Sequence, residues 1–171
     1  MRIVRFRWWH IEQVLPIEAD LFGAERWSAE MFWNELANGH HYLAAVDDPE
    51  QADPEQADSE QADSEQADRA EQVVGYAGLA LSGDPAAPDE AWVQNIAVRR
   101  DSQRLGLGRT LLTALLAEAA RRGAAKTLLE VAVDNAPAQR LYAAYGFEPV
   151  AVRRGYYQPS NTDALVMMRD G

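Results

Sequence analysis

Two glycines and two arginines stand together at the start of a predicted helix. The segment reads Gln103-Arg104-Leu105-Gly106-Leu107-Gly108-Arg109 and leads directly into an apolar-periodic run over 110–120. Glycine lets a ligand approach the main chain closely, and the first turn of a helix has unpaired N–H groups with partial positive charge. The segment therefore predicts a phosphate site in which backbone N–H groups hold the oxygens and Arg104 and Arg109 add charge-assisted contacts.

The spacing in this segment excludes two known phosphate-binding motifs. No Lys-Ser or Lys-Thr pair follows the glycines, so the segment is not a nucleoside-triphosphate P-loop. The third glycine of the dinucleotide-binding fingerprint is also missing. A phosphate ligand of a different kind is needed, and an ordinary turn before a helix is the alternative interpretation.

Glu130 is the only charged residue in the apolar run 128–133. The alternation of a strand places Leu128, Glu130 and Ala132 on one face. A carboxylate in such surroundings loses solvation, so we expect its pKa to rise, and a carboxyl group tuned in this way suits a general base near neutral pH. An ion pair at a strand end, or an exposed sheet edge, is the alternative interpretation.

Tyr142 lies on a short predicted helix, 137–145, which Asn135 caps and Gly146 ends. Tyrosines at this spacing pack in a core more often than they catalyse. A phenol at this position could nevertheless give a proton to a departing thiolate, so both interpretations stay open.

The composition favours a single soluble globular domain over residues 1–171, with 47% hydrophobic residues. No apolar run has the length of a membrane span, and the N-terminus lacks the features of a secretory signal, so we expect a cytoplasmic protein without membrane contacts. The absence of cysteine excludes disulfides and thiolate nucleophiles. The three histidines lack metal-ligand spacing, so we predict no metal site.

The net charge of −11 arises almost entirely from one acidic segment, in which Glu-Gln-Ala-Asp recurs every five residues between 50 and 68. That period fits neither helix nor strand, and the segment has no large apolar residue. We predict that 47–72 is a disordered insertion in a loop between two strands. The rest of the chain is close to neutral, which argues against nucleic-acid binding. We expect a monomer or weak dimer.

The remaining hydrophobic periodicities alternate between strands and helices. Expected strands cover 3–8, 42–46, 73–81, 91–98, 127–133, 148–154 and 164–168, and expected helices cover 11–22, 28–36, 106–122 and 137–145. Ser28 is the expected cap of the second helix. This order predicts an α/β or α+β fold built around a central sheet.

Several motifs together resemble one known family, the GCN5-related N-acetyltransferases. Gln103-x-x-Gly106-x-Gly108 matches the family's Q/R-x-x-G-x-G/A signature. The later family motifs follow in order as Asn95-Ile96-Ala97-Val98, Leu129-Glu130-Val131, Asn135, Leu141-Tyr142 and Tyr145-Gly146-Phe147. The resemblance covers nearly the whole chain except 47–72. It implies a mixed, mostly antiparallel sheet of about seven strands with helices on both faces.

Within that family the chain looks like the enzymes that acetylate the N-terminal alanine of a small-subunit ribosomal protein. Arg153-Arg154-Gly155-Tyr156-Tyr157 is similar to their R-R-x-Y-Y segment, although Gly155 stands where bulkier residues are common. The resemblance implies acetyl-CoA as co-substrate and a peptide N-terminus as acceptor, with Tyr156 and Tyr157 binding the peptide. A lysine side chain or a small-molecule amine is the alternative acceptor, and a non-catalytic acetyl-CoA-binding module is the alternative to an enzyme.

The resemblance also implies roles for individual residues in a direct transfer without a covalent enzyme intermediate. Glu130 would be the general base and Tyr142 the general acid. The backbone of Ile96, Ala97 and Val98 would bind the pantetheine and acetyl group like an added strand. The pyrophosphate would lie on Arg104, Leu105, Gly106, Leu107, Gly108 and Arg109, and Asn135 would contact the cofactor arm.

Overall fold

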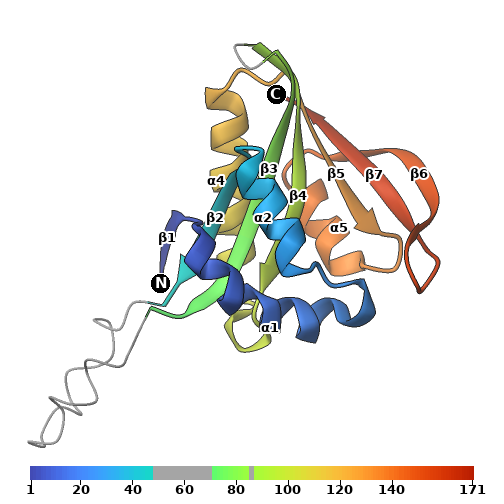
Figure 1. Cartoon of the computed structure of the whole chain (residues 1–171). Coiled ribbons are helices and arrows are strands. Elements are labelled where there is room, and N and C mark those ends of the chain that lie inside the picture. The colour runs from blue at the N-terminus through green and yellow to red at the C-terminus, as the bar shows by residue number, and fades with distance from the viewer. Residues whose placement is uncertain (48–70, 85–86) are drawn as a thin grey trace, which may run out of the picture.

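The computed structural model describes residues 1–47, 71–84 and 87–171, which form a seven-stranded sheet in the order β1-β2-β3-β4-β5-β7-β6 (Figure 1). The strands are β1 (Arg2–Arg5), β2 (His41–Val46), β3 (Val73–Asp84), β4 (Ala87–Val98), β5 (Lys126–Ala132), β6 (Glu148–Tyr157) and β7 (Thr162–Asp170). Neighbouring strands are antiparallel except β4 and β5, which are parallel. The predicted mixed, mostly antiparallel sheet is confirmed. The predicted disordered insertion falls largely on 48–70, outside the described residues, and stays a prediction.

Helices cover both faces of the sheet, as expected. On one face lie α1 (Ile11–Phe22) and α2 (Ala29–Ala37), and on the other lie α4 (Leu107–Arg121) and α5 (Ala136–Ala143). Short 3-10 helices among the described residues are η1 (Trp8–His10), η2 (Gly23–Glu25) and η6 (Arg100–Ser102). In the described part of the chain, no helix is long and apolar enough to cross a membrane.

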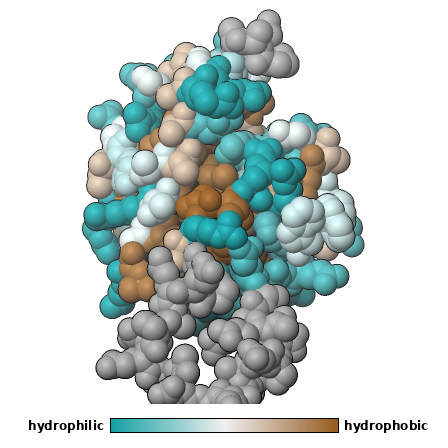
Figure 2. Space-filling view, turned by 90° about the vertical axis from the view of Figure 1, so that its left-hand side faces the viewer, coloured by the Kyte–Doolittle hydropathy of each residue, from teal (hydrophilic) through white to brown (hydrophobic). Residues whose placement is uncertain are grey.

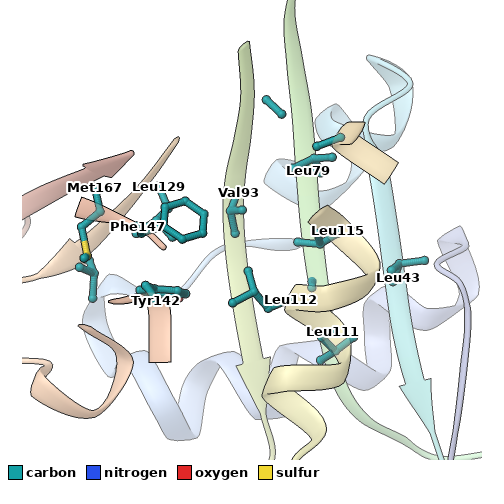
Figure 3. Close-up of a cluster of buried hydrophobic side chains, with 14 of the residues drawn as sticks. Leu43, Leu79, Val93, Leu111, Leu112, Leu115, Leu129, Tyr142, Phe147 and Met167 are labelled. Carbon is teal, nitrogen blue, oxygen red and sulfur yellow. The ribbon is translucent and has the colours of Figure 1, made fainter. Parts of the chain in front are cut away.

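The larger core lies between the sheet and the pair α4 and α5 (Figure 3). In α4 the buried residues recur at helical spacing and form one apolar stripe against β3 and β4: Leu107, Leu111, Leu112, Leu115 and Ala119. Tyr142 and Phe147 extend this core towards Leu129 and Met167. The stripe holds α4 firmly against the sheet and so fixes the position of the helix start at Leu107.

The second core is aromatic and lies beneath α1 and α2. Phe6, Phe32, Tyr42 and Tyr76 are fully buried there, and the rings of Phe32 and Tyr76 meet edge to face with centroids 5.4 Å apart. Gly78 of β3 makes room for this packing, because a Cβ at that position would lie 2.2 Å from Tyr42 Cζ.

Several predicted boundaries are wrong, for identifiable reasons. The first strand ends at Arg5, not Trp8, because the chain turns into η1, where His10 N donates to Arg7 O at 2.9 Å. Ser28 occupies the N-cap of α2, but its side chain makes no capping hydrogen bond. β3, β4, β6 and β7 are longer than predicted, because their hairpin pairing continues past the apolar residues that mark a strand.

The edge strand β1 is short and ends in arginine on both sides. Arg2 and Arg5 are exposed, whereas Ile3 and Val4 between them are half-buried. Figure 2 shows the side of the molecule that lies on the left in Figure 1, where β1 lies. Hydrophilic side chains surround an apolar area on this side. A short edge strand with charged ends resists pairing with another chain.

Candidate active site

The parallel strands β4 and β5 pair over only four residues each. Their register runs from Glu90 opposite Lys126 to Val93 opposite Leu129. Beyond this point β4 stays paired with β3, and β5 stays paired with β7. In the register of the described strands, the edge of β4 over 94–98 that faces β5 therefore has no partner, and it includes the predicted cofactor residues Ile96, Ala97 and Val98.

A β-bulge lies where β4 leaves β5. Gly78 pairs with Asn95 and Leu79 pairs with Val93, so Gln94 is an extra residue in β4. A bulge bends its strand and increases the local twist, which re-aims the backbone beyond it. The bulge thus helps β4 to diverge from β5 and leaves backbone groups along this edge available to an extended ligand.

The glycine-rich segment forms a tight connection between β4 and α4. Arg104 and Gly106 have positive φ angles of 64° and 84°. Gln103 Nε2 donates to Val98 O at 2.9 Å, which ties the connection to the end of β4. Among the described residues, none of the recorded hydrogen bonds is donated by a backbone N–H group of 104–109.

These free donors fit the pyrophosphate group of acetyl-CoA. They lie at the N-terminal end of a 15-residue helix, where the helix dipole favours negative charge. Arg104 and Arg109 are exposed beside them, and no ion pair joins either arginine to another described residue. The chemistry of the segment thus supports the predicted binding of a phosphate ligand.

We expect Gly106→Ala to raise the KM for acetyl-CoA severalfold while kcat changes little. An L-residue in the left-handed region is strained by roughly 1–2 kcal/mol, which favours a shift of the loop away from the position that binds phosphate. Steady-state kinetics with varied acetyl-CoA measure the effect. Gly123→Ala is the matched control, because Gly123 has a similar φ of 79° and follows the far end of α4. An equal change of KM in both variants would contradict this expectation.

Glu130 lies one residue past the last pairing of β5 with β4. Its neighbours Leu129 and Val131 are buried in the core under α4, so Glu130 belongs to the opposite face. Its side chain is only 13% exposed, and Arg153 Nη1 lies 2.6 Å from Oε1. The carboxylate is therefore held near the strand separation and forms the ion pair of the alternative interpretation, whereas its role as general base stays a prediction.

The ion pair leaves Oε1 of the carboxylate without a well-directed hydrogen bond. Oε1 is buried, and no donor in the described residues reaches it with hydrogen-bond geometry, although the guanidinium is close enough for an ion pair. Glu130 thus has both a charge partner and unused hydrogen-bonding capacity, which is what a group that accepts a proton from an amine requires.

Tyr142 is part of the core, as the first of its two interpretations predicted. Its side chain is 9% exposed and packs edge to face against Phe147, with ring centroids 6.0 Å apart. Burial raises the pKa of the phenol to about 12. Tyr142 therefore holds its proton at neutral pH and has one to give, so core packing and proton donation are compatible.

The end of β6 lies within electrostatic reach of both predicted catalytic groups. Burial is the first cause that raises the pKa of Tyr157, and the neighbouring charges of Tyr156, Glu130 and Tyr142 raise it further. The pKa of Tyr156 is raised to about 12, first by burial and then by the adjacent carboxylate of Glu130. Tyr156 and Tyr157 thus lie beside Glu130, and their role in peptide binding stays a prediction.

Two loops meet beside these tyrosines. Ser160, in the turn between β6 and β7, donates a hydrogen bond from Oγ to Glu25 Oε1 in η2. The contact joins the connection between α1 and α2 to the β6–β7 hairpin. These two segments therefore form a common border on the side of the sheet that carries Glu130.

Asn135 has a structural role that the sequence partly predicted. Its side-chain oxygen accepts from Ala138 N at 3.2 Å and caps α5. Gln139, which the sequence analysis did not single out, donates to the carbonyl oxygens of Ala132 and Val133 at 3.0 Å each and fixes the end of β5. The predicted contact of Asn135 with the cofactor arm remains a proposal.

A cavity of about 410 Å³ lies elsewhere, beside Arg5, His41 and Glu118. None of the predicted catalytic or cofactor residues lines it. The candidate site is defined by the separation of β4 and β5, the free N–H groups before α4 and the side chains around Glu130, and this cavity is not part of it.

Comparisons with known proteins agree with this geometry. The sequence model described as "Acetyltransferase (GNAT) family" matches residues 11–147. "N-alpha-acetyltransferase RimI" of Mycobacterium tuberculosis is 36% identical over 161 residues, covering 93% of this chain and 85% of the relative. The "Putative [ribosomal protein bS18]-alanine N-acetyltransferase" of Bacillus subtilis is 30% identical over 159 residues, covering 92% and 87%.

A solved structure extends the similarity to the fold. The crystal structure of the ribosomal-protein-S18-alanine N-acetyltransferase from Escherichia coli matches with a TM-score of 0.76 and 27% identity, over 99% of this chain and 92% of that chain. The family match spans the strand separation, the glycine-rich segment, Glu130 and Tyr142. The chain therefore belongs to the acetyltransferase (GNAT) family and is an N-acetyltransferase that uses acetyl-CoA.

Proposed function

We propose that this enzyme acetylates the α-amino group of a protein N-terminus, and that the acceptor is the N-terminal alanine of a small-subunit ribosomal protein. The observation that carries the proposal is the position of Glu130, a shielded carboxylate with unused hydrogen-bonding capacity where β4 and β5 separate. The names of the relatives in Mycobacterium tuberculosis, Bacillus subtilis and Escherichia coli support the choice of acceptor.

The residues of this chain divide the work of the reaction between them. Acetyl-CoA, when bound, supplies a thioester whose carbonyl carbon is open to attack by an amine. A peptide α-ammonium has a pKa near 7.7–8.0, so Glu130 removes its proton, directly or through water, to give the neutral nucleophile. Backbone N–H groups on the free edge of β4 would stabilise the oxygen that gains charge. Tyr142 would give its proton to the departing sulfur.

The residues around the base favour a peptide as the acceptor. Tyr156 and Tyr157 lie beside Glu130, and the β6–β7 turn contacts η2 through Ser160 and Glu25. Aromatic side chains with hydroxyl groups can pack against a peptide and hydrogen-bond to its backbone. A lysine side chain is the second candidate acceptor, since its amine needs the same base.

The proposed function is tested with three acceptors and purified enzyme. The first is a peptide that begins with Ala and carries an internal lysine, the second is the same peptide with a blocked N-terminus, and the third is a small amine. Mass spectrometry with fragmentation locates the acetyl group. We expect acetylation of the first peptide at its α-amine only, and acetylation of lysine in the blocked peptide at a similar rate would overturn the proposal.

We expect Tyr142→Phe to lower kcat by about 10²-fold or more, the range typical of general acid catalysis. The phenyl ring keeps the packing against Phe147, so the fold and acetyl-CoA binding should be preserved. Thermal unfolding and isothermal titration with acetyl-CoA provide those two checks. Tyr145→Phe is the control, because Tyr145 lies on the same segment and its hydroxyl pairs with Thr113 Oγ1 at 3.0 Å. Unchanged turnover in Tyr142→Phe would leave Tyr142 with a packing role alone.

A further inference from the structure

Arg153 lies on the same face of the sheet as Glu130, two strands away. Glu130 pairs with Val166 of β7, and Val166 pairs in turn with Ala151 of β6. Arg153 is two residues beyond Ala151, so its side chain leaves the sheet on that face. From there it reaches across β7 to bring Nη1 within 2.6 Å of Glu130 Oε1.

Two aromatic rings surround the guanidinium group. Its central carbon lies 5.8 Å from the ring centroid of Trp92 and 5.7 Å from that of Tyr156. The indole N–H of Trp92 donates to Glu90 at 3.0 Å, which holds the ring in place. A cation at such distances from aromatic faces is attracted by them. The Arg153 guanidinium therefore has favourable contacts other than its ion pair with Glu130.

The guanidinium occupies the position that the acceptor amine needs. An ammonium group transfers its proton to Glu130 either through one water or directly, and the direct route needs the place beside Oε1 that Arg153 holds. Arg153 fills this place without a well-directed hydrogen bond to Oε1, which an ammonium could make. Two cations on one shielded carboxylate repel each other, which favours the withdrawal of one of them. Arg153, whose side chain is 51% exposed, is free to do so.

We propose that Arg153 is a placeholder, which pairs with the Glu130 carboxylate in the free enzyme and yields its position to the α-ammonium group of the acceptor. Arg153 is thus a positioning residue that acts through Glu130. The inference rests on the proposed function for the identity of the acceptor. Titratable and charged groups of the described residues around Glu130 and Tyr157 include Arg153, Tyr156 and Tyr157 from β6, Tyr142 from α5 and Glu25 from η2, and Glu90 of β4 lies against the Trp92 ring beside Arg153.

The test replaces Arg153 by methionine, which keeps the apolar stem and removes the charge. At neutral pH we expect the KM for the Ala-starting peptide to fall about two- to fivefold, because the competing cation is gone. We also expect the acid limb of the pH profile of kcat/KM to shift to higher pH by about one unit, because the carboxylate has lost its cationic neighbour. Arg153→Lys should restore the position of the acid limb.

The matched control is Arg154→Met. Arg154 follows in sequence, but its side chain is 90% exposed, and its Nη1 lies 3.7 Å from Asp163 Oδ2. Its removal should change neither the peptide KM nor the acid limb. A peptide KM that rises in Arg153→Met at every pH would make Arg153 a substrate contact and overturn the placeholder role. An unchanged profile in Arg153→Met would overturn it too.

Two further measurements separate this inference from the proposed function. Peptide affinity is measured by calorimetry for Arg153→Met in a Glu130→Gln background, where we expect no gain, because the placeholder acts only through the carboxylate. NMR titration of the Glu130 carboxyl group needs no acceptor, and its midpoint should be higher in Arg153→Met than in the parent enzyme. An unshifted midpoint would overturn the inference even if peptides are acetylated. If the midpoint shifts but no peptide is acetylated, only the proposed acceptor is overturned.

Discussion

Glu130→Gln is expected to lower kcat by about 10²–10⁴-fold, the range over which a general base contributes to catalysis. The amide has nearly the same size as the carboxyl group but cannot take a proton from an ammonium at neutral pH. The affinity for acetyl-CoA should stay the same, because the free N–H groups before α4 and the edge of β4 are unchanged. Rapid kinetics with an Ala-starting peptide and calorimetry with acetyl-CoA measure the two quantities.

The control for this variant is a carboxylate of the same sheet away from the strand separation. Glu148 is exposed at the start of β6, so Glu148→Gln should leave kcat within about twofold of the parent enzyme. The pH profile gives a second check, since the acid limb of kcat should be absent in Glu130→Gln. A residual activity close to that of the parent enzyme would remove Glu130 from the mechanism.

Glu18→Gln is expected to change how stability depends on pH. Glu18 is 1% exposed in the aromatic core, where its carboxylate accepts hydrogen bonds from Trp27 N at 2.6 Å and from the hydroxyl group of Tyr76. Burial raises the pKa of Glu18 to about 7, although the Trp27 N–H group acts in the opposite direction. Glu18 thus joins α1 to Trp27, two residues past η2, and to β3.

The sign of the effect follows from proton binding. Between the reference pKa of 4.5 and about 7, the folded protein binds more protons at Glu18 than the unfolded chain. The contribution of Glu18 to stability therefore falls as the pH rises through this window, by up to about 1.4 kcal/mol per pH unit. The glutamine variant lacks this dependence, so its free energy of unfolding should improve relative to the parent protein across the window.

Chemical denaturation of both proteins at several pH values from 4.5 to 8 measures the difference. Glu12→Gln is the matched control, because Glu12 lies on the same helix but is exposed. It should show the same pH dependence as the parent protein. Parallel stability curves for Glu18→Gln and the parent protein would show that Glu18 binds protons equally in the folded and unfolded states.

The parts of the fold that depend on local patterns could be predicted from the sequence. The apolar stripe of α4, its start after Gly106 and the cap at Asn135 are all set by neighbours within a few residues. The ends of strands could be predicted less well. The strand predicted over 3–8 is cut short by η1, because the turn into η1 does not appear as a break in the apolar pattern.

The partner of Glu130 could not be predicted, because it depends on the order of distant strands. Arg153 reaches Glu130 only because β7 lies between β5 and β6, and hydrophobic periodicity does not determine that order. The sequence indicated only that a shielded carboxylate needs a cation nearby. It did not indicate which residue supplies that cation. Glu18 was missed although it continues the buried stripe of Ile11 and Val14, where an acidic residue is unusual.

The unpaired edge of β4 has a thermodynamic consequence. Because no strand of the described residues pairs with 94–98 on the side of β5, a ligand bound along this edge, as we propose for the acetyl-CoA arm, would complete the sheet. A ligand that binds only the folded form stabilises it by roughly 2.7 kcal/mol at a hundred times its Kd. Supply of the acyl donor and lifetime of the folded enzyme are therefore linked, and a shortage of the donor makes the protein itself easier to unfold.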